Sequence, residues 1–122
     1  MVDDIKTLLN RLRELDFDTW WAIDFAIDIK DESYLTSGYD LDNIQGCIQR
    51  AIAARSGWNL MLHLYTFHGG IYEAHIMVKQ YIDGKELRDM LDFSSYHEKD
   101  ASIRSLAHAC LFAYVAALEG TR

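Results

Sequence analysis

"MLHLYTFHGGIYEAHIMV", residues 61–78, consists of two runs of alternating residues separated by a Gly-Gly pair. Alternation of apolar and polar side chains is typical of a strand with one buried face, and glycines between two such runs are typical of a hairpin turn. The stretch therefore predicts an antiparallel hairpin. Its two histidines, His63 and His75, are expected to lie close together across the pair.

The apolar pattern also predicts the register of this hairpin. A three-residue loop at 68–70 places Leu62 opposite Ile76 and Leu60 opposite Val78, so that one face of the pair is wholly apolar. A two-residue turn would mix apolar and polar side chains on both faces. Since a slip by one residue turns every side chain to the other face, we expect the register of the longer loop.

A third strand is expected to follow, because Asp83-Gly84 is a strong signal for a two-residue hairpin turn. This turn would place Ile76 opposite Leu91 and His75 opposite Asp92. The residues that we expect to be buried together in the core are Leu60, Leu62, Ile76, Val78, Leu91, Ile103 and Leu111.

The polar face of the predicted sheet is the candidate functional surface. It gathers two histidines, carboxylates and aromatic side chains, a mixture that suits recognition of a partner by binding. The predicted binding residues are His63, Tyr65, Phe67, Glu73, His75 and Asp92. The N-terminal helix is an alternative cover for this face, in which case these side chains would form a second core.

The row of His63, His75 and Asp92 also has the chemistry of a small active site. Two imidazoles and a carboxylate, completed by Glu73 or by water, are suitable ligands for Zn²⁺, and Asp92 could instead orient His75 as a general base. The sequence contains no metalloprotease, nucleotide-binding or hydrolase motif that supports either chemistry. We therefore predict no catalytic residue, no metal ligand and no cofactor, with a metal- or histidine-dependent enzyme as the alternative.

The flanking sequence predicts an α+β fold in a single domain, residues 1–122. Apolar residues recur at helical spacing in 3–15, 41–56 and 101–119, whereas residues 19–29, "TWWAIDFAIDI", alternate like a strand. We expect an antiparallel sheet of four to five strands, with an N-terminal helix and with the helices at 41–56 and 101–119 packed on one face.

Charge and composition exclude some classes of partner. The chain carries 19 acidic and 12 basic residues, a net charge of −7, which disfavours broad nucleic-acid binding because that depends on clustered Lys and Arg. The sequence has no run of the length of a membrane span and no secretory signal at its start. Cytoplasmic localisation is expected, with Cys47 and Cys110 as free, buried thiols.

The last predicted helix is apolar on its back as well as on its inner side. A helix that is apolar all round is expected to be buried all round, and a chain of 122 residues has little left to cover it. We therefore predict a homodimer through this helix. The residues of that predicted interface are Ala109, Phe112, Ala113 and Ala116.

Residues 58–119 resemble small accessory proteins of tailed phages, of the ABA-sandwich kind. The resemblance is carried by "GWNLMLHL", by the tyrosine strand "IYEAHIMV" and by the helix entry "KDASIRSLAHACLFAYVAALE". A "PLAIC" pattern at the helix entry, which those proteins have, is absent. The resemblance implies a phage or prophage protein without enzyme activity, which blocks or sequesters a host defence component, either a protein or a nucleotide signal.

Overall fold

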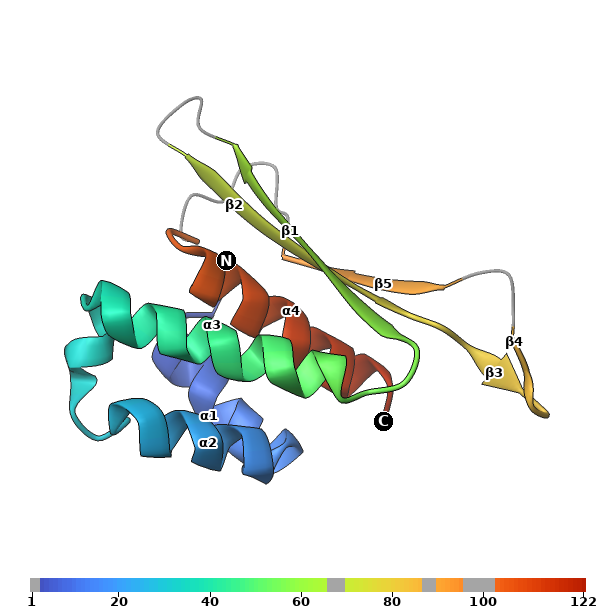
Figure 1. Ribbon diagram of the computed structural model, residues 1–122, viewed down its shortest axis with the longest axis horizontal. Coiled ribbons are helices and arrows are strands. Elements are labelled where there is room, and N and C mark those ends of the chain that lie inside the picture. The colour runs from blue at the N-terminus through green and yellow to red at the C-terminus, as the bar shows by residue number, and fades with distance from the viewer. Residues whose placement is uncertain (1–2, 66–69, 87–89, 96–102) are drawn as a thin grey trace.

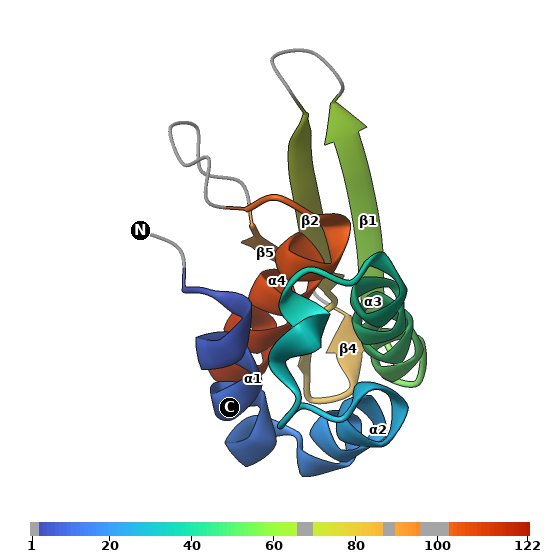
Figure 2. The ribbon, with the colours of Figure 1, turned by 90° about the vertical axis from the view of Figure 1, so that its left-hand side faces the viewer.

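The computed structural model describes residues 3–65, 70–86, 90–95 and 103–122, and its elements form three layers (Figure 1). A three-stranded antiparallel sheet is one outer layer, α3 and α4 form the middle layer, and α1 and α2 form the other outer layer, as the side view also shows (Figure 2). The elements are α1 (Ile5–Leu15), α2 (Phe17–Ile27), the 3₁₀ helix η1 (Glu32–Leu35), α3 (Gly38–Ala53), β1 (Trp58–Tyr65), β2 (Ile71–Val78), β3 (Tyr81–Ile82), β4 (Lys85–Glu86), β5 (Leu91–Ser94) and α4 (Leu106–Gly120).

The sheet has the strand order β1-β2-β5, and its apolar face is the predicted one. Ala74, Ile76 and Val78 of the central strand are buried against α4, while Leu60 and Leu62 of β1 are half-buried and pack on the same core. This confirms the α+β class and the assignment of the two faces. Alternation alone decides which face is apolar, because successive side chains of a strand point to opposite sides.

The register of the hairpin differs from the prediction by two residues. Leu60 lies opposite Ile76 and Leu62 opposite Ala74, and the chain uses five residues, 66–70, between the paired Tyr65 and Ile71. A shift of two residues leaves every side chain on its predicted face. The apolar pattern therefore could not distinguish this register from the predicted one.

The Asp83-Gly84 turn forms, but it closes a separate two-stranded sheet of β3 and β4. On the main sheet, β5 then pairs Ile76 with Phe93, and not with Leu91 as predicted. Leu91 lies at the end of the sheet and is exposed, so its assignment to the core was wrong. Within the described residues the main sheet has three strands, fewer than the four to five predicted.

The prediction of a strand at residues 19–29 was wrong, because most of this segment is helix α2. Thr19, Ile23 and Ile27 are buried at helical spacing, whereas Trp21 and Phe25, which the strand pattern placed on the same face as Ile23, are exposed. A segment that is apolar on several sides fits both the two-residue period of a strand and the 3.6-residue period of a helix. The helix cap at Asp16 and the packing against α1 and α3 favour the helix.

The other helices are confirmed with changed ends. α1 begins after Asp4, whose carboxylate accepts a hydrogen bond from the backbone N–H of Thr7. α3 is capped by Ser37, and α4 is capped by Ser105.

Helix α4 is the centre of the fold. It packs against the sheet on one side and against α1 and α3 on the other, and Ile103 and Leu111 are buried as predicted. Ala109 and Ala113 are fully buried within the chain. These two residues of the predicted interface are thus covered within the chain, whereas Phe112 and Ala116 are half-buried.

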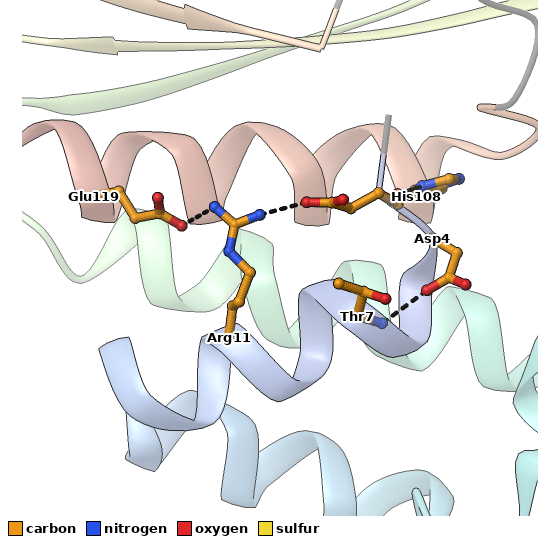
Figure 3. Close-up of polar contacts among 6 residues, drawn as sticks. Asp4, Thr7, Arg11, His108 and Glu119 are labelled. Carbon is orange, nitrogen blue, oxygen red and sulfur yellow. Dashed lines mark hydrogen bonds and ion pairs between the residues drawn. The ribbon is translucent and has the colours of Figure 1, made fainter. Parts of the chain in front are cut away.

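Polar contacts join the N-terminal segment to α4 (Figure 3). Arg11 of α1 forms ion pairs with Asp3 and with Glu119 of α4, and His108 of α4 lies with its Nε2 2.8 Å from the backbone oxygen of Asp3. The Arg11 pairs are partly exposed and therefore add little to stability. They join α1 to α4, on the side of the middle layer that faces away from the sheet (Figure 2).

None of the helices in the described part of the chain has both the length and the apolar character that a membrane crossing requires.

Substitutions in β2 test the assignment of the faces. Ile76→Ala removes a fully buried side chain and should lower the free energy of unfolding by about 2–5 kcal/mol. Met77→Ala, at the next position on the opposite face, should lower it by less than about 1 kcal/mol, because Met77 is half-exposed. Urea unfolding measures both. Equal losses at the two positions would contradict the model of one buried face.

Candidate functional site

The face of the sheet that points away from α3 and α4 carries the predicted binding residues, and we call it the histidine face. It is formed by Met61, His63 and Tyr65 of β1, Glu73, His75 and Met77 of β2, and Asp92 of β5. Helix α1 lies on the far side of the middle layer and does not cover it (Figure 2). Of the two alternatives for this face, a second core under the N-terminal helix is therefore wrong.

His75 lies at the centre of the histidine face between two carboxylates. Its Nε2 contacts Oε1 of Glu73, two residues earlier on the same strand, and its Nδ1 lies 3.5 Å from Oδ1 of Asp92. Glu73 is only 8% exposed, so His75 is the partner that compensates for the burial of its carboxylate. When protonated, the imidazole donates from both ring nitrogens, one towards each acid.

His63 joins this group through its ring. The imidazole stacks on Tyr65, with ring centroids 6.0 Å apart, and meets the ring of His75 edge-on at 5.9 Å. The shifted register places His63 directly opposite Glu73, whereas the predicted register placed it opposite His75. The histidines are diagonal neighbours, and the predicted straight row is a staggered one.

The structure brings together five of the six predicted site residues: His63, Tyr65, Glu73, His75 and Asp92. The sixth, Phe67, lies outside the described residues. Asp92 stands directly opposite Met77 and reaches His75 diagonally. Since Met61 and Met77 share this face, it mixes flexible apolar surface with fixed polar groups.

Both ring nitrogens of His75 face carboxylate oxygens, one of Glu73 and one of Asp92. Within residues 3–65, 70–86, 90–95 and 103–122, no three His, Cys, Asp or Glu side chains are placed to hold a metal ion. The two carboxylates hold the imidazole of His75 in position.

A second polar cluster, which the sequence did not reveal, lies where α1 meets α2. Oδ2 of Asp16 accepts hydrogen bonds from the hydroxyls of Thr19 and Tyr114, both at 2.5 Å. The guanidinium of Arg55 lies 3.9 Å from the same oxygen, donates from Nε to the Tyr114 hydroxyl at 3.3 Å and stacks over Trp58. The cluster links the α1–α2 junction to α4 and to the start of β1.

The electrostatics of this cluster indicate a structural role. Burial opposes ionisation of Asp16, but the hydrogen bonds from Thr19 and Tyr114 and the charge of Arg55 outweigh it and lower the pKa of Asp16. Burial, together with the bond to Asp16, raises the pKa of Tyr114 to about 12. A fully buried phenol that resists ionisation is not a base for a substrate.

The two cysteines are free and buried, as predicted. Burial raises the pKa of Cys110 to about 12, so its thiolate is disfavoured and the thiol is not a nucleophile.

No protein family, curated protein or solved structure matches this chain. The resemblance of residues 58–119 to phage accessory proteins stays a prediction.

The raised pKa of Tyr114 gives a testable dependence of stability on pH. The unfolded phenol ionises near pH 10 and the folded one near pH 12, so stability present below pH 10 is lost as pH rises towards 12. The loss should be on the order of 2 kcal/mol. In Tyr114→Phe this part of the loss should vanish, while the exposed control Tyr39→Phe should behave like the wild type. Urea unfolding at pH 9 and pH 11.5 measures the difference, and an identical loss in Tyr114→Phe would contradict the assignment.

Proposed function

We propose that this chain is a non-catalytic binding protein that holds its partner on the histidine face. The observation that carries the proposal is the arrangement of that face: aromatic, methionine and imidazole side chains lie on the side of the sheet away from the described helices, around a histidine fixed by two acids. Aromatic side chains and methionine supply contact area, and fixed polar groups supply specificity.

In biological terms, we propose a small cytoplasmic accessory protein of phage or prophage type. Its partner would be a host protein or a small nucleotide signal, which it inhibits or sequesters. The proposal draws on the resemblance of residues 58–119 and on the net charge of −7, which favours a basic partner over a nucleic acid. A homodimer through α4 would rest on Phe112 and Ala116, the two residues of the predicted interface that are half-buried.

An enzyme that uses His63, His75 and Asp92 is the weaker alternative. General-base or metal chemistry requires a ring nitrogen that is directed at the reacting group. His75 directs both of its nitrogens at Glu73 and Asp92.

The proposal predicts a loss of binding without a loss of fold. His63→Ala combined with Tyr65→Ala removes the stacked pair but leaves the buried Glu73 with its partner His75. The amount of partner captured from a bacterial lysate should fall at least ten-fold, with the thermal transition nearly unchanged. Mass spectrometry of the retained proteins and nucleotides, normalised to the bait, measures the effect.

The matched control is Tyr81→Ala, which removes an exposed aromatic side chain from β3, outside the main sheet. Capture should be unchanged in this variant. Equal capture by the wild type and the His63/Tyr65 variant would place the partner elsewhere on the molecule.

A further inference from the structure

Helix α2 carries three large aromatic side chains on its outer surface. Phe17, Trp21 and Phe25 are 52%, 55% and 81% exposed, and their spacing of four residues aligns them along one face of the helix. We call these three residues the aromatic stripe. The opposite face of α2, with Thr19, Ile23 and Ile27, is buried. α2 belongs to the outer helical layer, across the molecule from the sheet (Figure 2).

The aromatic stripe is held in a defined conformation. The rings of Trp21 and Phe25 stack with centroids 5.6 Å apart, and Phe17 stacks on Trp20 at 5.7 Å. Trp20 is in turn held under the guanidinium of Arg13, at 4.6 Å. Side chains that are already ordered lose less conformational entropy when a partner covers them.

Both ends of α2 are fixed as well. Asp16 caps the first turn and is bonded to Tyr114 of α4, and the carboxylate of Asp24 accepts from the backbone N–H of Ile29 at 2.9 Å. The helix therefore presents the stripe as a rigid surface. Exposed apolar side chains that form a contiguous group on a folded surface mark a site of interaction.

The charges around the stripe indicate the kind of partner. Residues 16–28 contain Asp16, Asp18, Asp24 and Asp28 and neither Lys nor Arg. Asp18 and Asp28 are exposed; of the basic residues that flank this segment, Arg13 is engaged with Trp20, and Lys30 is exposed beyond the end of the helix. A second copy of this chain would bring the same acids to the contact, which disfavours self-association. A surface of the opposite charge is complementary.

We propose that the aromatic stripe of α2 is a second docking surface, which packs against the apolar face of an amphipathic helix bordered by lysine and arginine on a partner protein. Anchors one turn apart along α2 can interdigitate with the apolar side chains of such a helix. The apolar anchors give affinity, and the acidic border selects helices with a basic border. The surface lies in the opposite outer layer from the histidine face and acts independently of it.

The test uses the full-length chain and a defined probe, a fluorescently labelled amphipathic peptide of leucine and lysine. Fluorescence anisotropy should show binding of this peptide to the wild type. Trp21→Ser combined with Phe25→Ser leaves the net charge unchanged and should raise Kd at least ten-fold. Asp18→Asn combined with Asp28→Asn should raise Kd about three-fold and weaken its dependence on salt. A peptide with glutamate in place of lysine should not bind.

Two controls keep the result specific to α2. Tyr81→Ser, which changes an exposed aromatic residue of β3, and the His63/Tyr65 variant should both bind the peptide like the wild type. Because the substituted α2 residues are exposed, circular dichroism should show the same thermal transition in all variants.

Several outcomes would overturn the proposal. These are no binding to the wild type, an unchanged Kd in the Trp21/Phe25 variant, and equal binding of the glutamate peptide. Sedimentation that shows self-association of the wild type, lost in the Trp21/Phe25 variant, would assign the stripe to a second copy. Tighter binding to phosphatidylcholine vesicles than to the peptide would assign it to a lipid surface.

Discussion

The hydrogen bond from the Tyr114 hydroxyl to the carboxylate of Asp16 is the interaction on which the arrangement of the layers depends. The backbone N–H of Asp16 bonds to Leu12 and ends α1, its side chain caps α2 at Thr19, and its Oδ2 accepts from Tyr114 at the centre of the fold. One residue thus ends a helix, begins the next and joins both to α4. Arg55 and its stacked Trp58 extend the link to the first strand. Because the cluster is largely buried and hydrogen-bonded, loss of one member leaves the others unsatisfied.

The three-layer arrangement explains why the molecule has two separate candidate surfaces. α4 is buried almost all round, since the sheet covers one side and α1 and α3 cover the other. The outer face of the sheet and the outer face of α2 are then left uncovered at opposite sides of the molecule (Figure 2). The first is polar and aromatic with a histidine fixed between acids, and the second is aromatic with an acidic border.

The sequence predicts those features that depend on the periodicity of side chains. Alternation in 61–78 places Ile76 inside and His75 outside, and this holds although the register is displaced by two residues, because such a shift keeps the faces. The same reasoning failed for 19–29, where apolar residues on several sides fit both a strand and a helix. The cap signal, Asp16 three residues before Thr19, was the local feature that favoured the helix. The contacts of Asp16 with Tyr114, 98 positions away, and of His75 with Asp92 are tertiary and are not encoded in any local pattern.

A double-mutant cycle with Asp16→Ala and Tyr114→Phe tests most directly whether this link organises the fold. The free energy of unfolding is measured by urea titration at pH 7 for the wild type, both single variants and the double variant. We expect the sum of the two single losses to exceed the loss in the double variant by a coupling free energy of at least about 1 kcal/mol, because the two side chains share a partly buried hydrogen bond to a charged group. Losses that add to within about 0.5 kcal/mol would show that the Asp16–Tyr114 hydrogen bond does not couple the α1–α2 junction to α4, and would contradict the central role of Asp16.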